Sequence, residues 1–229
     1  MKETAAWVAG IGAVLMGEIP KTSIAISRQI GSGGTYIGYL AARRLGFQYV
    51  DREILREAAR QLEIDVGVLE SLDQRSSGLV ENLIRAFTFG TPDARNAPLR
   101  KPIYEKDLFA VECRIMNEIA ERYDAVIVGR AGFYALRKRP RVIRVFVHAP
   151  LEFRVQRIMR VHALTDREAR GLVEETDRRR AKFIKDMTGT DWYDARNYHL
   201  CIDAGVIDFD TGVAMIAGLA GRIGKGEKP

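Results

Sequence analysis

Three glycines, a serine and a threonine stand in the stretch RQIGSGGTY, residues 28–36, directly after the apolar run SIAIS at 23–27. A turn of this kind between a strand and a helix can bind phosphate, because successive backbone N–H groups and the helix N-terminus point into one concavity. The residues that would line it are Gly31, Ser32, Gly33, Gly34 and Thr35. The same residues also suit a tight turn that only connects a strand to a helix, so the loop alone leaves both interpretations open.

The standard phosphate-loop pattern, G-x-x-x-x-G-K-[ST], can be placed on residues 28–35. Gly33 and Thr35 keep the second glycine and the hydroxyl, whereas Arg28 stands at the first glycine and Gly34 at the lysine. The lysine of such loops normally contacts the outer phosphates. Its absence predicts weak catalysis unless another cation supplies the charge.

Arginines recur in short groups at 137–144, 154–160 and 178–180, in a chain whose net charge is +6. A basic chain suits nucleic acid, an anionic membrane surface or phosphorylated small molecules, and net charge alone does not separate them. No nucleic-acid-binding module is recognisable in the sequence. We therefore expect arginines directed at phosphate groups to explain the charge excess.

Three consecutive arginines follow Asp177, and convergent arginines can neutralise the charge on a phosphoryl group during its transfer. The alternative is a solvated helix face, in which Glu174 pairs with Arg178 and Glu175 with Arg179 at i,i+4 spacing. Three adjacent arginines exceed what two such pairs require, which favours the phosphate-directed interpretation.

The composition is that of a globular protein, with 229 residues, 47% of them hydrophobic and 29% charged. This length fits one α/β domain with helical insertions, or one domain and a subdomain. Cys113 and Cys201 lie far apart without a Cys-x-x-Cys motif, and the chain has three histidines. Neither a disulfide framework nor a zinc site is predicted.

Apolar periodicity and turn residues predict strands that alternate with helices. Residues 23–45 are expected to form a strand, a glycine turn and a helix, and a helix with Ile54 and Leu55 on its apolar face follows a short strand at 47–51. Mostly helical structure is expected at 65–123, broken by a mobile loop at 89–102. The order is then completed by strands at 124–129 and 142–150, a helix at 151–162, a long helix opened by a capping box at 165–168, a strand at 198–203 and a helix through 213–223. This alternation predicts a parallel sheet with helices on both sides.

The first twenty residues include the apolar stretch AAWVAGIGAVLMG, which is too short to span a bilayer. A signal peptide needs a basic start and a small-x-small cleavage site, whereas here Lys2 is followed by Glu3 and no convincing cleavage site follows. We expect an N-terminal extension at 1–20 that packs or forms oligomers rather than a membrane anchor, and a cytoplasmic protein.

Three segments in order, ISRQIGSGGTYIGYLAARRLGFQYVDREIL, VIVGRAGFYAL and VIRVFVHAPLEFRVQRI, resemble the cytidylate kinase-like family, a branch of the P-loop nucleoside monophosphate kinases. The resemblance extends from about Ile24 to Ile216. It implies an α/β fold of the P-loop kinase type, with three layers, a mainly parallel five-stranded sheet, a helical insertion that binds the nucleoside monophosphate, and a small helical lid. A single kinase-like domain is therefore expected at 21–229, with the insertion at 52–123 and the lid at 160–190.

The resemblance also implies an activity, since cytidylate kinases proper transfer the terminal phosphoryl group of ATP to CMP or dCMP with Mg²⁺. The implied ligands of the ATP phosphates are Gly31, Ser32, Gly33, Gly34 and Thr35, and the hydroxyl of Thr35 is also assigned to the metal ion. The implied monophosphate ligands are Asp51, Arg56 and Arg130. The implied catalytic arginines are Arg178, Arg180, Arg157 at the base of the lid, and Arg28 in place of the missing lysine.

Several of these positions have a structural alternative. Asp51 could equally cap the following helix, and Arg130 could form a surface ion pair. His148 stands where cytidylate kinases often have an aspartate after the fourth strand, which leaves the base specificity open. Aromatic residues after the lid are expected to anchor the last strand rather than to stack on adenine; they are Trp192, Tyr193 and Tyr198.

The leading hypothesis is a nucleoside monophosphate kinase that depends on Mg²⁺ and ATP, with CMP or dCMP as the acceptor. A degenerate nucleotide-binding or sensing protein is the second, because the loop lacks its lysine. A kinase with a different small-molecule acceptor is the third, because a fold does not fix a substrate. The expected partners are nucleotides, without nucleic acid or membrane, and a homodimer is left open.

Overall fold

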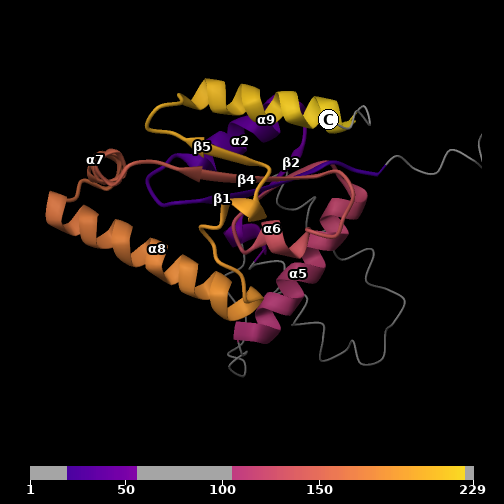
Figure 1. The fold of residues 1–229 in the computed structure, drawn as a ribbon, viewed down its shortest axis with the longest axis horizontal. Helices are drawn as coiled ribbons and strands as arrows, with labels where there is room; N and C mark the ends of the chain where they lie inside the picture. The colour runs from indigo at the N-terminus through magenta and orange to yellow at the C-terminus, as the bar shows by residue number, and fades with distance from the viewer. Residues whose placement is uncertain (1–19, 56–104, 225–229) are drawn as a thin grey trace, which may run out of the picture.

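A five-stranded parallel sheet forms the centre of the molecule. The structure is a computed structural model and describes residues 20–55 and 105–224. Within these ranges the strands follow the order β2-β3-β1-β4-β5 (Figure 1). The strands are β1 (Ser23–Arg28), β2 (Gln48–Val50), β3 (Ala125–Val128), β4 (Val142–His148) and β5 (Leu200–Asp203). The predicted fold class, a mainly parallel α/β sheet, is confirmed.

Helices lie on both faces of the sheet (Figure 1). One face is covered by α2 (Gly34–Leu45) and α9 (Phe209–Gly224), which also contact each other. The other is covered by α5 (Glu105–Arg122) and the short α6 (Gly132–Ala135). This arrangement gives the three layers that the alternation of strands and helices predicts.

Two consecutive helices extend from the end of β4. The first, α7 (Leu151–His162), has the predicted bounds, and α8 (Asp166–Thr188) is 23 residues long. The predicted capping box is present, because Thr165 Oγ1 accepts from the Glu168 N–H while the Glu168 carboxylate accepts from the Thr165 N–H at 2.9 Å. A 3₁₀ turn, η1 (Ala195–Asn197), precedes β5.

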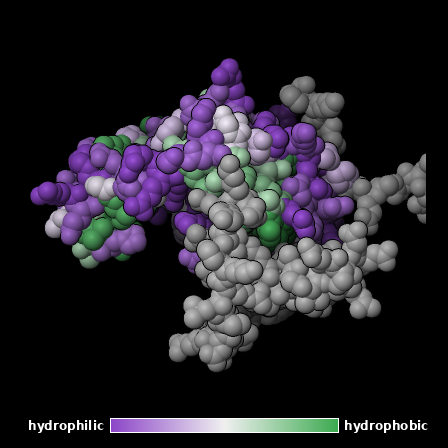
Figure 2. Space-filling view, turned by 90° about the horizontal axis from the view of Figure 1, so that it is seen from below, coloured by the Kyte–Doolittle hydropathy of each residue, from purple (hydrophilic) through white to green (hydrophobic). Residues whose placement is uncertain are grey.

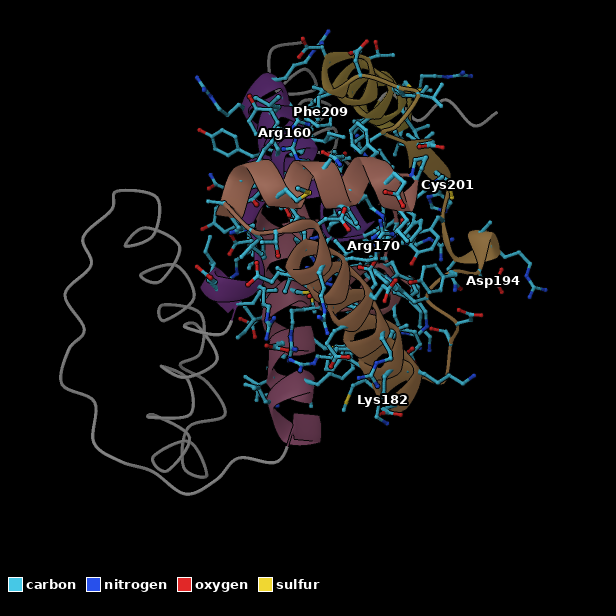
Figure 3. The ribbon with its side chains drawn as sticks, turned by 90° about the vertical axis from the view of Figure 1, so that its left-hand side faces the viewer. Arg160, Arg170, Lys182, Asp194, Cys201 and Phe209 are labelled. Atoms are coloured by element: carbon cyan, nitrogen blue, oxygen red, sulfur yellow. The ribbon has the colours of Figure 1, made fainter. Side chains whose placement is uncertain are left out.

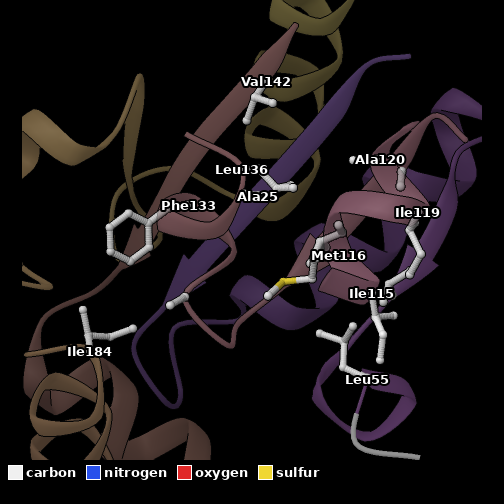
Figure 4. Packing of buried hydrophobic residues seen from close by; sticks show 14 of the residues in the cluster. Ala25, Leu55, Ile115, Met116, Ile119, Ala120, Phe133, Leu136, Val142 and Ile184 are labelled. Carbon is white, nitrogen blue, oxygen red and sulfur yellow. The ribbon is translucent and has the colours of Figure 1, made fainter. Parts of the chain in front are cut away.

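Neighbouring residues of β1 belong to two separate cores, as its central position requires. Ile24 and Ile26 pack with Ile216 on the side of α2 and α9, whereas Ala25 packs with Met116 on the side of α5. Figure 4 shows this second core, in which side chains of α5, α6 and α8 gather. Burying an aliphatic side chain of this size contributes about 1.5–3 kcal/mol, so both layers hold the sheet in place.

All strands end at one edge of the sheet, the side on which α7 lies in Figure 1. The loop after β1 and the turn after β3 are therefore neighbours although about 100 residues separate them, and the Gly129 N–H donates to the Ile26 carbonyl oxygen at 2.9 Å. Ligands of open α/β sheets bind at this carboxyl edge.

Some predictions fall outside the described residues: the extension at 1–20, Arg56, the loop at 89–102 and most of the insertion at 52–123. The domain boundaries and the homodimer stay predictions. No helix in the described part of the chain combines the length and apolar character that crossing a membrane requires. The projecting end formed by α7 and the first turns of α8 carries mainly hydrophilic side chains (Figure 2).

Candidate functional site

The loop between β1 and α2 turns through two glycines in the left-handed region. Gly31 has a φ of 78° and Gly33 a φ of 84°, values that L side chains rarely adopt. A Cβ on Gly31 would lie 2.8 Å from the carbonyl oxygen of Arg154, and a Cβ on Gly33 would lie 2.6 Å from the ring of Phe209. Backbone conformation and lack of room therefore both require glycine at these two positions.

The loop leads into the N-terminus of α2, which has the properties of an anion site. Gly33 provides no side-chain cap, and the first turn contains no acidic residue. The N–H groups of a first helical turn have no acceptor within the helix, and the positive end of the helix dipole lies there too. Gly34 and Thr35 lie in this turn. The Gly34 N–H already has a long contact with Ser32 Oγ at 3.4 Å, whereas the positive end of the helix dipole and the other first-turn N–H groups can attract an anion such as phosphate.

Ser32 has a different position from its predicted neighbours, because its hydroxyl points into the protein. The hydroxyl donates to the carbonyl oxygens of Gln29 at 2.8 Å and Val147 at 3.2 Å, and the residue is fully buried. Its side chain holds the loop against β4. Its backbone N–H also donates to the Gln29 carbonyl oxygen, at 3.4 Å, so Ser32 supports the loop rather than facing a phosphate.

Arg28, the last residue of β1, extends from the loop toward the end of β3. Its Nε donates to Thr35 Oγ1 at 3.3 Å, and a Cβ on Gly129 would overlap its Nη1. No carboxylate of the described residues forms an ion pair with it. Burial, and then the charge of nearby Arg180, lower the pKa of Arg28 to about 10. The guanidinium is still charged at neutral pH and lies where an anion would be stabilised.

A buried carboxylate joins this loop to α8. Asp177 Oδ1 accepts the Ile30 N–H at 3.0 Å, and its Oδ2 accepts Arg154 Nη1 at 2.6 Å. Burial raises the pKa of Asp177, and the Ile30 N–H and the Arg154 charge oppose that shift. One turn further along α8, Arg180 Nη1 donates to the carbonyl oxygen of Arg28 at 3.0 Å. The network therefore holds an arginine of α8 against the loop.

Two cavities meet at these side chains. The first, which we call the loop cavity, has a volume of about 420 Å³ and is lined by the glycine loop, by tyrosines of α2 and β2, and by α7. The second, the arginine cavity, has a volume of about 490 Å³ and lies between the ends of β1 and β3 and the second half of α8. Arg28 and Arg180 line both cavities.

Cations dominate the polar lining of the arginine cavity. Arg28 and Arg180 are joined there by Arg52, Arg130, Arg179 and Lys182, while Asp186 is the acidic residue of the lining that the structure describes. Phe183, Met187 and Trp192 provide an apolar part of the wall. The cavity therefore suits a ligand with an anionic group and an aromatic or apolar group.

Arg130 lies in this wall but already has a counter-charge. Its Nε donates to Glu112 Oε2 at 2.6 Å, and its Nη2 lies 2.5 Å from the same oxygen. The Arg130 side chain is 8% exposed and that of Glu112 0%, and the guanidinium lies 4.4 Å from the ring centroid of Phe183. The ion pair is buried rather than on the surface, so Arg130 contributes less uncompensated charge to the cavity than Arg28 does.

Two further predicted site residues differ in position: Arg157 lines a cavity, whereas the Asp51 carboxylate caps a helix. Asp51 caps the next helical turn, because its Oδ1 accepts the N–H groups of Glu53 and Ile54 at 2.9 and 3.2 Å. Arg157 lines the loop cavity with its guanidinium 4.8 Å from the ring centroid of Phe209. Figure 3 shows Phe209 on the side of α7 opposite to α8, whose distal part carries Lys182.

Arg178 is not brought to either cavity. Its side chain is 71% exposed and pairs with Glu175, which also accepts from Arg179 Nε at 2.5 Å. The alternative of a solvated ion pair therefore describes Arg178 well, although its partner is Glu175 and not Glu174. Arg179 shares that partner and still lines the arginine cavity.

Sequence reasoning missed several residues that position or line the site: Arg52, Arg154, Asp177 in its holding role, Arg179 and Lys182. Arg154 and Asp177 stand within the segments that carried the family resemblance and the arginine motif, but their pairing joins residues 23 positions apart on two helices. Arg52 follows the predicted Asp51 directly, so its position at a strand end was a usable signal.

One explanation based on the sequence is wrong. The arginine group at 137–144 precedes or begins β4, at the opposite edge of the sheet from the glycine loop. It cannot be directed at a phosphate bound there, so that part of the charge excess has another origin.

The expected anchoring role of the aromatic residues is confirmed for Tyr198, whose hydroxyl donates to the Trp192 carbonyl oxygen at 2.8 Å in the core.

The chain belongs to the cytidylate kinase-like family, whose model matches residues 23–205. The match includes the glycine loop, β3 with Arg130, and the whole of α8. No protein of curated function matches the sequence as a relative.

Solved structures are similar to this chain over most of its length. A protein from Eubacterium ventriosum ATCC 27560, described as uncharacterized, matches with a TM-score of 0.66 and 21% sequence identity, over 88% of this chain and 99% of that one. A shikimate kinase from Bacteroides thetaiotaomicron matches with a TM-score of 0.48 and 15% identity, over 86% and 97% of the two chains. A gluconokinase from Sinorhizobium meliloti 1021 matches with a TM-score of 0.47 and 15% identity, over 90% and 95%. Similarity at this identity identifies a fold and not a substrate.

Proposed function

We propose that the protein transfers the terminal phosphoryl group of ATP to a nucleoside monophosphate, with CMP or dCMP as the first acceptor to test. The observation that carries this proposal is the meeting of the loop cavity and the arginine cavity at Arg28 and Arg180. A donor in the first cavity and an acceptor in the second would place their phosphates against the same two guanidinium groups. Membership of the cytidylate kinase-like family supports this assignment of donor and acceptor.

The donor phosphates are proposed to bind the loop cavity through the backbone of Gly31, Gly33 and Gly34 and the first turn of α2. No described group of three or more histidine, cysteine or acidic side chains could hold a metal ion. Magnesium bound mainly by phosphate oxygens and water fits such a site, and Thr35 would supply one protein oxygen. The Thr35 hydroxyl accepts one hydrogen bond from Arg28 and retains a second lone pair for this purpose. When bound, the ion neutralises charge on the outer phosphates.

The acceptor is proposed to bind the arginine cavity with its monophosphate toward Arg52 and Arg180 and its base toward the apolar wall. A phosphorylated acceptor fits this lining better than a neutral polyol, because six cationic side chains line the cavity and a dianion can bind to several of them. Arg130 would act mainly through the shape of the wall, since Glu112 already neutralises it.

In the proposed step, an oxygen of the acceptor phosphate forms a bond to the γ-phosphorus of ATP. The bond from that phosphorus to the β–γ bridging oxygen breaks, and its electron pair leaves with ADP. The products are ADP and a nucleoside diphosphate, and no protein group is covalently changed. Arg28 and Arg180 would stabilise the charge on the phosphoryl group as it moves between the cavities.

The test is ADP release from Mg·ATP with CMP, dCMP, UMP, AMP and GMP. The variants are Thr35→Ala and Arg180→Ala, and the control is Arg44→Ala in the last turn of α2, where the side chain is exposed. We expect turnover that requires one of the acceptors, falls at least about 100-fold in Arg180→Ala and stays unchanged in the control. Turnover that needs no acceptor, or that survives both site variants, would refute the proposal.

A second candidate is nucleotide binding without efficient transfer, which the glycine at the lysine position favours. It predicts measurable ATP binding and no ADP release that depends on an acceptor. A kinase acting on another small phosphorylated molecule is the outcome if ATP turns over only with an acceptor outside the panel.

Because the proposed substrates are cytoplasmic metabolites, we also propose a cytoplasmic protein without nucleic-acid or membrane partners.

A further inference from the structure

Gly34 has no backbone reason to be glycine. Unlike Gly31 and Gly33, it does not have a positive φ, and it begins α2 in a helical conformation that most residues adopt. What excludes a side chain is space, because a Cβ at this position would lie 2.5 Å from the Cβ of Arg28 and 2.9 Å from the Cβ of Val147. The position that carries the lysine in a standard phosphate loop is therefore closed by the first side-chain atoms of Arg28 and Val147, with the nearer contact at Arg28.

The guanidinium of Arg28 then occupies the space in front of the loop. Its Nε donates to the hydroxyl of Thr35, and its Nη1 lies over Gly129, where a Cβ would overlap it. It lines both cavities. A positive charge is thus present at the mouth of the loop, but it originates from the end of β1 and not from α2.

No carboxylate of the described residues forms an ion pair with this charge, unlike Arg130 with Glu112, although the charge of Asp51 acts to raise the pKa of Arg28. Arg180, which lies 3.8 Å from Asp177, is close enough to help lower the pKa of Arg28, so two cations face the same space. An arrangement of this kind is stabilised when an anion binds between the two groups.

We infer that Arg28 contacts the outer phosphates of the nucleotide in place of the loop lysine, and that an arginine at 28 and a side chain at 34 exclude each other. The first part, the charge half, rests on the proposed function. The second part, the steric half, is a property of the loop alone. Arg28 acts as a permanent cation, so it neither gives up a proton nor forms a bond in the transfer step.

The steric half is tested by thermal unfolding of Gly34→Ala, Arg28→Gly and the double variant, without ligand. We expect Gly34→Ala to lower Tm by about 5 °C or more, and the same change to cost less than half as much in the Arg28→Gly background. Some cost remains there because the contact with Val147 is still present. Equal costs in the two backgrounds would overturn mutual exclusion.

The charge half is tested by calorimetric binding of inorganic tripolyphosphate, which needs neither acceptor nor turnover. The proteins are wild type, Arg28→Ala, Arg28→Lys and Arg44→Ala as a matched arginine control. We expect affinity to fall at least about tenfold in Arg28→Ala, to fall less in Arg28→Lys and to stay unchanged in the control. Arg28→Gly with Gly34→Lys, which restores the standard pattern, should regain part of the affinity lost in Arg28→Gly.

The two proposals fail differently in this experiment. If wild type binds tripolyphosphate and Arg28→Ala binds it equally well, the role of Arg28 is wrong and the proposed function stands. If wild type does not bind it, the loop is not a phosphate site, and the proposed function fails together with the charge half. The unfolding cycle decides mutual exclusion in either case.

Discussion

Strands β1 and β3 end at the same edge of the sheet, and each has an arginine there: Arg28 is the last residue of β1, and Arg130 lies in the turn after β3. After β3 the backbone is left-handed at three successive residues, with φ values of 91° at Gly129, 46° at Arg130 and 55° at Ala131. Two of these are not glycine, which costs about 1 kcal/mol or more each. The buried pair with Glu112 holds this turn in place. Arg28, by contrast, has no carboxylate partner among the described residues.

The comparison shows how residues of one type acquire different roles at one edge. A buried arginine with a tight carboxylate partner keeps its counter-charge whether or not a ligand is present, and removal of that partner destabilises the protein. A partly buried arginine without an ion-pair partner gains one when an anion binds. Counter-charge, more than position, separates a structural cation from a ligand-binding one.

The largest expected effect is on stability. Glu112→Ala should lower the free energy of unfolding by about 3–5 kcal/mol, because it leaves Arg130 charged and buried. Urea unfolding measures this, with Glu121→Ala as control; Glu121 is 71% exposed and 4.0 Å from Arg139, and its loss should cost less than about 1 kcal/mol. Equal costs for the two variants would show that Arg130 does not depend on its partner.

The second prediction compares two arginines of α8. Arg180→Ala should reduce acceptor-dependent ADP release by about 100-fold or more, because Arg180 lines both cavities. Arg178→Ala should reduce it less than about threefold, since Arg178 is exposed and paired with Glu175. Steady-state kinetics measure both, and a larger effect of Arg178→Ala would mean that α8 presents a different face when substrates bind.

The third prediction concerns ligand-induced stabilisation. Tripolyphosphate at 100 times its dissociation constant should stabilise the wild type by about 2.7 kcal/mol, which raises Tm by about 5–10 °C. Arg28→Gln at the same concentration should show a clearly smaller shift, whereas Arg43→Ala, exposed at the far end of α2, should match the wild type. Differential scanning fluorimetry checks this, and identical shifts in Arg28→Gln and wild type would contradict the comparison.

The smallest expected effect is a gain in stability without ligand. The pKa of Arg28 is lowered to about 10 in the folded protein, below its ordinary value, so burial of its charge destabilises the folded state at neutral pH. This cost is relieved only as the pH rises above about 10, because only there does the folded protein release the proton before the unfolded chain does. Arg28→Gln should therefore raise the unliganded Tm at pH 7 by about 2–4 °C. A lower Tm would mean that the contact with Thr35 outweighs the charge.

Local features were predictable from the sequence because contiguous residues determine them. Alternation of apolar and glycine-rich segments predicted the five strands, and the capping box predicted where α8 begins. The glycine loop was predicted as a phosphate site, and the structure adds the two positive φ values that require Gly31 and Gly33. Propensity, capping and turn chemistry act within a few residues and leave a direct trace in the order of amino acids.

The sequence by itself determined the α/β class, the position of the loop and the residue types that could meet phosphate. The tertiary structure alone decided which arginines reach the cavities and which arginines are already paired, because both buried partners come from distant elements: Glu112 on α5 for Arg130, and Asp177 on α8 for Arg154. It also revealed that Gly34 is closed by Arg28, since van der Waals contact between the two side-chain positions arises only when the loop is folded. Charge pairing and steric exclusion depend on distances in space, and those are fixed by packing across the whole sheet.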